Sequence, residues 1–337
     1  MDGYTGFGTK EKLTDQGTYR CLRISDLTEM GMVKGTEKTC EDENYLLKEG
    51  DILFARVGSH TFKSYRYDPA DGPLAYASFL MCFHVEKDNP RYIQYYALSH
   101  RFQKQVLAKS SCSTRNVISA KDLQGLPLPH PDRAQQDRIV EILAPVYESY
   151  ANAYRKEMLL DSYAQECFAN RFTPGKQEGY VPLSSLAIRK NGKVRQDAGG
   201  PVPIYNSGGV TGGLYESMPE QEAILVPKKG SLNNVFYVSR PFWASITMAI
   251  LVPKRKEDLY YLYCLLRSCD LMALNADSIA PGIHMEMLDN LLIPVYSEEK
   301  KKDFFNDMEP VFSEIGILRK KQRTLRSLFY TLSDQIF

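Results

Sequence analysis

The sequence predicts an α+β protein made of two similar mixed α/β domains in pseudo-two-fold duplication, each followed by one long helix. Residues 298–337 place apolar side chains at alternating spacings of four and three residues, the heptad pattern of a helix that packs along another helix. The same pattern occurs 165 residues earlier without a gap. We therefore expect two matching helices that pair as a coiled coil within one chain.

The seam between the two helices is predicted from the heptad positions. Its members are Ile139, Leu143, Val146, Tyr150 and Leu160 in the first helix, and Phe304, Met308, Val311, Ile315, Leu318, Leu325, Phe329 and Leu332 in the second. A polar residue interrupts the pattern at the same place in each copy, Glu157 and Gln322. We expect these two residues to fix the register of the pair.

Residues outside the seam also match at this offset. Pro129 and Pro145 correspond to Pro294 and Pro310, and paired prolines do not follow from an apolar seam. Duplication of a whole domain is therefore favoured over chance similarity. A period of 165 residues is too long for a solenoid repeat, which predicts two large copies rather than an array.

The duplication and the composition of the linker predict the domain boundaries. These are a first domain at residues 1–132, a long helix at 133–172, a linker at 173–180, a second domain at 181–297 and a second long helix at 298–337. The second domain opens with a strand-like segment at 181–186, and the first has no match to it ahead of Tyr19. We therefore expect the first domain to be short at its N-terminal edge.

Within each domain, β-prone runs alternate with turn residues. The predicted strands are 19–24, 52–57, 76–85, 181–186, 223–227 and 244–253, and the predicted shorter helices are 89–109 and 258–274. Asn89 followed by Pro90 is typical of a helix start, because proline is well accommodated at the first helical position.

Composition bounds the class of protein. A chain of 337 residues with 43% hydrophobic content can form two cores. No run is long and apolar enough to cross a membrane, and the first residues have no apolar signal segment. The seven cysteines are an odd number without a CxxC pair, which favours reduced thiols in a cytoplasmic protein over disulfides or structural zinc.

Motifs for covalent chemistry are missing from the sequence. The five histidines form no HExxH pattern, and there is no GxSxG elbow, no P-loop and no Asn/Asp-Pro-Pro-aromatic motif of an adenine methyltransferase. Asp289 with Glu298 and Lys300 could suggest a metal-dependent nuclease, but the first copy carries Arg133 and Gln135 at the places of the last two. We predict no catalytic residue, no metal and no cofactor on this chain.

Charge is balanced overall but segregated along the chain. The net charge is +1, yet the stretches between Asp88 and Asp122 and between Glu222 and Glu257 each contain six basic residues and no acidic one. Such segregation can create a positive face on a neutral protein and favours a polyanionic partner. An ordinary solvated surface remains the alternative for any single cluster.

Basic and amide residues gather in corresponding loops of both copies, as DNA readers require for phosphate and base contacts. The candidates are Arg56, Ser59, His60, Lys63, Arg66, Ser113, Thr114, Arg115 and Asn116 in the first domain, and Lys190, Lys193, Arg195, Lys228, Lys229, Ser231, Asn233, Asn234 and His284 in the second. For the serine, threonine and asparagine residues, turn formation or helix capping is at least as good an explanation.

Four stretches resemble the specificity subunit of type I restriction–modification enzymes. They are Arg-Ile-Ser-Asp-Leu at 23–27, Gly-Asp-Ile-Leu-Phe-Ala-Arg-Val-Gly-Ser at 50–59, Ser-Thr-Arg-Asn-Val-Ile-Ser-Ala-Lys-Asp-Leu at 113–123, and Leu-Pro-Leu-Pro-His-Pro-Asp-Arg-Ala-Gln-Gln-Asp-Arg-Ile-Val at 126–140. The resemblance extends over nearly the whole chain. The second copy departs from it, because Lys301 or a neighbour replaces the glutamine found at 135 or 136.

The resemblance implies two target-recognition domains that each read one half of a bipartite site on double-stranded DNA. It implies that the long helices pair antiparallel, act as a spacer and dock two methyltransferase subunits, which carry S-adenosylmethionine, with a nuclease and translocase subunit joining them. The alternatives are a coiled-coil scaffold or a truncated, silent specificity subunit, and an enzyme that acts on nucleic acid by itself.

Overall fold

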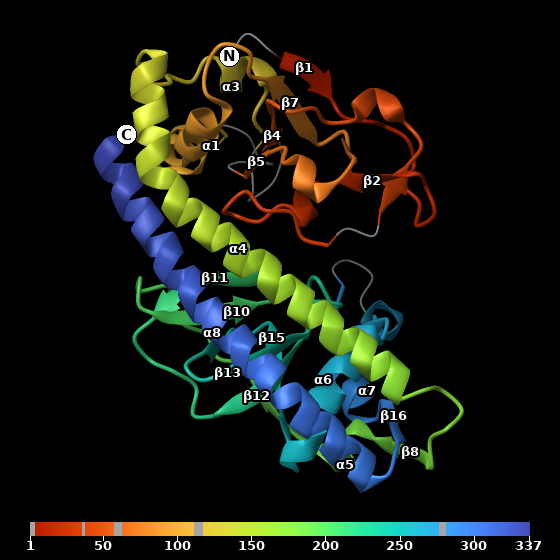
Figure 1. Ribbon diagram of the computed structural model, residues 1–337. Coiled ribbons are helices and arrows are strands. Elements are labelled where there is room, and N and C mark those ends of the chain that lie inside the picture. Colours follow the sequence, from red (N-terminus) through yellow and green to blue (C-terminus); the bar gives the residue numbers. More distant parts are fainter. Residues whose placement is uncertain (1–3, 36–37, 57–62, 111–116, 276–280) are drawn as a thin grey trace. The chain divides into compact units, whose positions relative to one another are not determined.

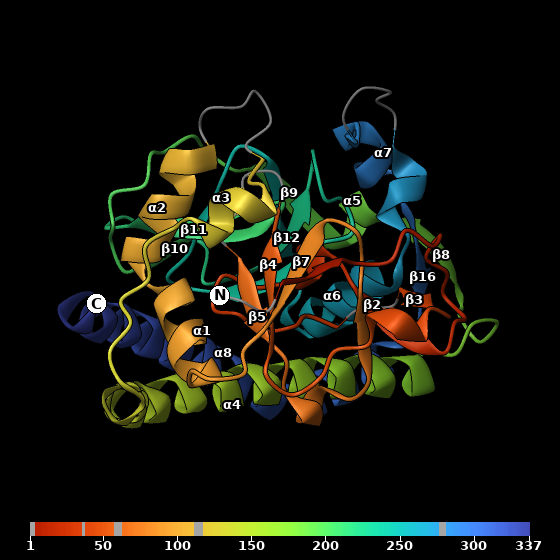
Figure 2. The ribbon, with the colours of Figure 1, turned by 90° about the horizontal axis from the view of Figure 1, so that it is seen from above.

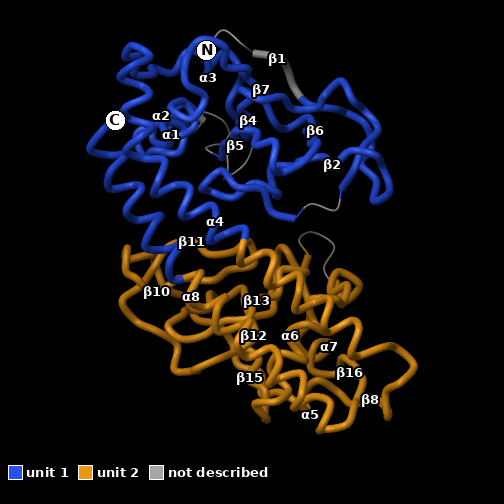
Figure 3. Tube along the Cα trace, in the orientation of Figure 1, with its two compact units in different colours: residues 1–155, 320–337 blue, residues 156–319 orange. Residues whose placement is uncertain are grey.

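The computed structural model describes residues 4–35, 38–56, 63–110, 117–275 and 281–337 (Figure 1). Contacts divide the chain into two compact units (Figure 3). Unit 1 contains residues 1–155 and 320–337, and unit 2 contains residues 156–319. Both boundaries fall inside long helices, α4 (Arg133–Arg171) and α8 (Glu298–Ile336), so each unit includes part of each helix.

The described part of unit 1 contains two small sheets and several short helices. The strands are β1 (Tyr4–Phe7), β2 (Tyr19–Leu22), β3 (Thr39–Cys40), β4 (Asp51–Ala55), β5 (Ser64–Arg66), β6 (Leu74–Tyr76) and β7 (Leu80–His84), and the helices are α1 (Pro90–Leu98), α2 (His100–Ser110) and α3 (Ala120–Gln124). The four-stranded sheet has the order β1-β7-β4-β5 and the three-stranded sheet the order β3-β2-β6, in which β2 and β6 are parallel.

Unit 2 has the same plan. Its elements are β8 (Gly179–Pro182), α5 (Leu183–Leu186), β9 (Ala187–Asn191), β10 (Val202–Asn206), β11 (Gly209–Leu214), β12 (Glu222–Pro227), β13 (Phe236–Ser239), β14 (Trp243–Ala244), β15 (Met248–Pro253), α6 (Leu259–Ser268), α7 (Met285–Asp289) and β16 (Leu292–Val295). The order β9-β15-β12-β13 corresponds to β1-β7-β4-β5, and β11-β10-β14 corresponds to β3-β2-β6, again with one parallel pair. The mixed α+β class predicted from the sequence is confirmed.

The long helices pack against each other within each unit. In unit 1 the start of α4 lies beside the end of α8, where the rings of Tyr147 and Phe329 are 6.0 Å apart (Figures 1 and 2). In unit 2 the end of α4 meets the start of α8, and Phe172 lies 5.2 Å from Phe304. The two helices therefore run antiparallel in each unit. All the predicted seam residues are buried or half-buried.

The polar residue Glu157 in α4 is bound by Arg319 of α8, whose Nε lies 2.7 Å from Oε1 of the carboxylate. Burial acts to lower the pKa of Arg319, but the Glu157 carboxylate outweighs that effect and the pKa lies above its ordinary value. The register role predicted for Gln322 stays a prediction.

Several predicted elements are divided in the structure. The helix predicted at 89–109 is two helices, because Ser99 between them has an extended backbone with φ −67° and ψ 151°. The strands predicted at 76–85 and 244–253 are each interrupted by a turn, and the strand predicted at 181–186 ends at Pro182, where α5 begins.

Unit 1 has a strand ahead of Tyr19 that the sequence pattern did not predict. Strand β1 pairs with β7 in the way that β9 pairs with β15, with Tyr4 opposite Phe83. It was missed because its Gly-rich sequence has no strand pattern. Within the described part of unit 1, no strand corresponds to β8, which pairs with β16 in unit 2.

Candidate nucleic-acid interface

Two strand ends meet at one edge of the four-stranded sheet of unit 2. Strands β9 and β12 are both antiparallel to β15, so they run parallel to each other and end at the same edge. Asn191 ends β9, and Lys228 follows Pro227 at the end of β12. The Lys228 ammonium lies 3.3 Å from Oδ1 of Asn191. Basic and amide side chains are therefore brought together at this edge.

The loop after β12 is held by two other segments. The Gly230 amide donates to the Pro281 carbonyl (2.9 Å), and the Ile283 amide donates to the Lys228 carbonyl (2.9 Å). Gly230 has φ +91°, and a Cβ there would lie 2.6 Å from Oγ of Ser207 in the β10–β11 turn. The close approach requires glycine and brings the turn and the segment before α7 to the same edge.

The electrostatics of this edge favour an anion. In the part of the chain that the structure describes, no carboxylate lies within ion-pair distance of Lys228 or Lys229. Burial, together with the positive charges of Arg189 and Lys229, lowers the pKa of Lys228 below its ordinary value. Positive charge that is not neutralised internally attracts phosphate. We call this set, Lys228, Lys229, Asn191 and Ser207, the unit 2 edge.

A second basic segment follows β9. The Lys193 amide donates to the Ala244 carbonyl (2.9 Å), and the Lys193 carbonyl accepts from Nε1 of Trp243 (3.1 Å). The Arg195 guanidinium lies over the Trp243 ring, 5.3 Å from its centroid. Lys193 and Arg195 are exposed, so both can reach a ligand. Arg195 and Lys190 both have an acidic partner, Glu216 at 3.5 Å and Glu220 at 2.9 Å.

The amide candidates have structural partners. Asn233 donates to Asp270 (3.2 Å) and accepts from the Met272 amide, which holds a short helical turn at Leu271–Leu274. Asn234 donates to the Ser207 carbonyl (2.7 Å). These contacts agree with the alternative of turn stabilisation. Ser231 and His284 are exposed at the same edge.

Fewer candidates of unit 1 can be located. Ser59, His60, Ser113, Thr114, Arg115 and Asn116 lie outside the described residues. Arg56 directly follows β4, as Lys228 directly follows β12.

Two further unit 1 candidates, Lys63 and Arg66, are built into the interior. Lys63 is only 6% exposed, and its ammonium donates to the Leu27 carbonyl at 2.7 Å. Nε of Arg66 donates to Gln94 (3.0 Å), whose amide donates to the hydroxyl of Tyr147 in α4 (2.9 Å). Lys63 is buried and Arg66 is half-buried, and in this structure both residues connect parts of unit 1. Their DNA-binding role stays a prediction.

Sequence reasoning missed Asn191 and Ser207. Asn191 lies within the basic run 189–195, and Ser207 lies in the turn between β10 and β11. The parallel direction of β9 and β12 brings Asn191 to Lys228, and the close approach at Gly230 brings Ser207 to the loop after β12. The signal that could have found them is their position, since each directly follows a β-prone run.

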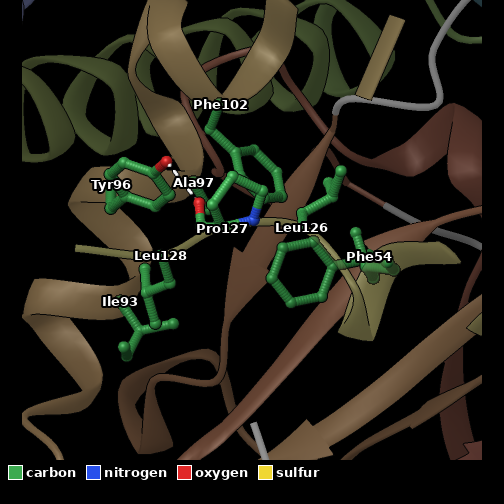
Figure 4. Close-up of a pocket in the computed structure, with 9 residues that line it drawn as sticks. Phe54, Ile93, Tyr96, Ala97, Phe102, Leu126, Pro127 and Leu128 are labelled. Atoms are coloured by element: carbon green, nitrogen blue, oxygen red, sulfur yellow. Dashed lines mark hydrogen bonds between the residues drawn. The ribbon is translucent and has the colours of Figure 1, made fainter. Parts of the chain in front are cut away.

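A small apolar cavity in unit 1 lies between Phe54, Phe102 and Pro127 (Figure 4). Its volume of about 10 Å³ is at the lower limit for one water molecule. The Tyr96 hydroxyl closes it by donating to the Pro127 carbonyl at 2.9 Å. The cavity is a packing gap and not a ligand site. Within the described residues, no group of three metal-ligating side chains is present, and no helix is long and apolar enough to span a membrane.

Part of the chain matches a known protein family. Residues 7–157 match the family model of the "Type I restriction modification DNA specificity domain". A comparison with curated proteins found no match.

Three solved structures are similar over nearly the whole chain. The type I restriction-modification S subunit from M. genitalium is 17% identical, with a TM-score of 0.45 over 99% of this chain and 93% of that chain. The HsdS subunit from Thermoanaerobacter tengcongensis is 15% identical, with a TM-score of 0.37 over 98% and 94%. A structure from a study of complex assembly in the type I R-M system is 14% identical, with a TM-score of 0.36 over 99% and 97%.

All three TM-scores are below 0.5, so the function of this chain is inferred from the family match. That match confirms the resemblance seen in the sequence for this part of the chain: residues 7–157 match the type I restriction modification DNA specificity domain.

Proposed function

We propose that this protein is the non-catalytic DNA-recognition subunit of a type I restriction–modification complex. The observation that carries the proposal is the family match over residues 7–157. The strand orders of unit 1 recur in unit 2, so the same role extends to the second half of the chain. Each half then reads one part of a bipartite site on double-stranded DNA.

The unit 2 edge has the parts that such a reader needs. Lys228 and Lys229 supply positive charge for the phosphate backbone, which sets the position of a protein on DNA. The amide and hydroxyl groups of Asn191 and Ser207 are suited to hydrogen bonds with base edges. Arg56 has the corresponding place at the end of β4 in unit 1.

The antiparallel helix pair acts, in this proposal, as a spacer and as a docking surface for two methyltransferase subunits. S-adenosylmethionine binds to those subunits, and cleavage belongs to a nuclease and translocase subunit. This chain supplies sequence recognition to all of these activities.

Methylome sequencing of cells that carry the complete operon tests the proposal. We expect a bipartite methylated motif that disappears when this chain is deleted. A methylome without such a motif would overturn the assignment. A silent scaffold would instead leave purified complexes with equal affinity for all random duplexes in a gel-shift assay.

Charge removal tests the placement of the interface. The double variant Lys228→Gln/Lys229→Gln should weaken DNA binding and reduce the slope of log affinity against log salt by up to about 1.8, since each phosphate contact contributes about 0.9. Lys254→Gln is the matched control, because Lys254 follows β15 at the opposite edge of the same sheet. An equal effect of both variants would contradict the placement.

A further inference from the structure

A matching β-turn precedes the last strand, in chain order, of the four-stranded sheet in each unit, β7 in unit 1 and β15 in unit 2. In unit 1 the Leu80 amide donates to the Ala77 carbonyl (3.0 Å), and in unit 2 the Met248 amide donates to the Ser245 carbonyl (3.0 Å). The two corner residues are Ser78 and Phe79 in the first turn, and Ile246 and Thr247 in the second. The turns join a strand of the three-stranded sheet to a strand of the four-stranded one.

Each turn exposes one large apolar side chain at its corner. Phe79 is 57% exposed and Ile246 is 56% exposed. Turn corners favour Gly, Asn, Asp, Ser and Pro, which have a backbone or hydrogen-bonding reason to be there. Neither Phe nor Ile has such a reason, and neither contributes its full apolar area to a core. A residue choice that contradicts local rules in both copies points to a role outside the fold.

Both turns lie against the basic residue at the end of the central strand. The Arg56 amide donates to the Phe79 carbonyl at 3.1 Å, and the Lys228 amide donates to the Thr247 carbonyl at 2.7 Å. In unit 2 the segment that contains Lys193 also lies beside the turn, because the Lys193 amide donates to the carbonyl of Ala244, the residue before the turn. The apolar corner therefore lies beside Arg56 in unit 1 and beside Lys228 of the unit 2 edge in unit 2.

A single exposed apolar residue is ordinary on a protein surface. Tyr180 on β8, for example, is exposed to the same 57% and has no counterpart in the described part of unit 1. Phe79 and Ile246 differ because the same turn, beside the same strand end and a basic residue, presents an apolar group in both units, at its second corner residue in unit 1 and at its first in unit 2. The shared chemistry is an apolar group next to a phosphate-binding cation.

We propose that Phe79 and Ile246 each contact the apolar surface of a base pair, and that each sets the preferred base at one position of its half-site. This rests on the proposed function. A thymine methyl group or a base face is the apolar surface that DNA offers beside its phosphates. The contact involves no charge, so it adds sequence discrimination that salt does not screen.

The inference is tested by selecting bound sequences from a random duplex library with the full chain in its methyltransferase complex. The variants are Phe79→Ala and Ile246→Ala, and Tyr180→Ala is the control of equal exposure. Each corner variant should lose base preference at one or two positions of one half-site, with affinity for the selected site reduced by about 5- to 100-fold. The other half-site and the salt slope should not change.

The outcomes separate this inference from the proposed function. If the wild-type complex selects no motif, the proposed function fails and the inference fails with it. If the wild type selects a bipartite motif and both corner variants select the same one at the same affinity, only the inference is overturned. A loss of affinity that is equal for all sequences would also overturn it, since that result indicates damage or a protein contact. Unchanged thermal melting of the variants excludes unfolding as the cause.

Discussion

A buried polar residue marks the start of each long helix. Gln136 in α4 is 1% exposed, donates to Asp88 (2.7 Å) and accepts from the Asn89 amide (2.8 Å). Lys301 has the equivalent place in α8, is 3% exposed and lies 2.6 Å from Asp258. The sequence left open which residue replaces the glutamine, and the structure identifies Lys301. The same connection is a hydrogen bond from an amide to a carboxylate in one unit and an ion pair in the other.

The ion pair makes unit 2 sensitive to loss of Lys301. The variant Lys301→Met should lower the free energy of unfolding by about 3–5 kcal/mol, because Asp258 would remain buried without its cation. The double variant Lys301→Gln/Asp258→Asn should recover most of the loss, since it leaves no buried charge. The fluorescence of Trp243, the single tryptophan and a residue of unit 2, follows unfolding in urea. A double variant as unstable as the single one would contradict this account.

Lys63 gives unit 1 a dependence on pH. Burial, aided by the positive charge of Lys34, lowers the pKa of Lys63 from 10.5 to about 8. Between these values the unfolded chain holds a proton that the folded chain lacks, so stability rises with pH through this window. From pH 8 to 9.5 we expect a contribution of about 2 kcal/mol. Lys63→Met should flatten this rise in hydrogen-exchange measurements on unit 1 amides. An equally steep rise in the variant would refute the assignment to Lys63.

This residue also shows why the interface was only partly predictable. The sequence presents Lys63 as one basic residue among several near a strand end, and nothing local indicates that its ammonium meets the Leu27 carbonyl. Burial is a property of the assembled unit. Lys228 has a similar sequence context, yet it stays half-buried at a strand edge without a carboxylate in ion-pair range among the described residues.

The long helices were predicted well, but part of their buried apolar surface was missed. The heptad pattern identifies the seam between the helices, because coiled-coil contacts repeat at two positions in seven. It misses the neighbouring positions, such as Tyr147 in α4 and Phe312 in α8, which face the body of each unit. A helix that packs against both a helix and a domain has a wider apolar stripe than a seam.

Phe312 should therefore matter more than its seam neighbour Val311. Phe312 is 1% exposed, and its ring stacks on Tyr260 at 4.2 Å and meets Tyr237 edge to face at 4.9 Å between ring centroids. Phe312→Ala should cost about 3–5 kcal/mol through the cavity it leaves, whereas Val311→Ala at a half-buried position should cost about 1 kcal/mol. Urea unfolding followed at Trp243 measures both. Equal costs would mean that the seam, and not the wider face, dominates the packing.

The missed turns have a common physical reason. The runs at 76–85 and 244–253 look like single strands because Phe79 and Ile246 are strong strand formers. In the structure each run leaves one sheet and enters another, so the chain bends where the pattern continues. Local propensity cannot report a change of sheet. The disagreement falls at the two residues to which we assign base contacts.

At the scale of the whole molecule, the sequence predicted two similar halves from matched residues at a fixed offset. It could not predict the sheet orders, because strand pairing depends on contacts between distant segments. In the parallel pairs β2–β6 and β10–β14, the two paired strands are separated in the sequence by strands that belong to the four-stranded sheet. These pairings position the ends of β4 and β12, and so they define the interface.

The spacer role of the helix pair predicts a change in the DNA site. Deleting seven residues from α4 and seven from α8 shortens each helix by about 10 Å, at about 1.5 Å per residue. The gap between half-sites should shrink by about three base pairs, at about 3.4 Å each, with the half-sites unchanged. Library selection measures the gap. The control is an insertion of Gly-Ser residues into the linker at 173–180, which should leave the gap between half-sites unaltered. If the helix deletion also left the gap unaltered, the spacer role would be disproved.

Unit 1 is completed by residues from the far end of the sequence. Phe337 packs 5.7 Å from Tyr92 and 5.3 Å from Tyr96, and Phe329 is fully buried in the same core. During synthesis, the first half of the chain must therefore wait on the ribosome with an uncovered apolar surface while all of unit 2 is translated. All residues of unit 2 are synthesised before unit 1 is complete, although unit 2 begins later in the sequence. A premature stop after residue 319 would leave unit 2 with all of its residues but remove residues 320–337 from unit 1. Unit 1 would then expose apolar surface and be recognised by chaperones and proteases.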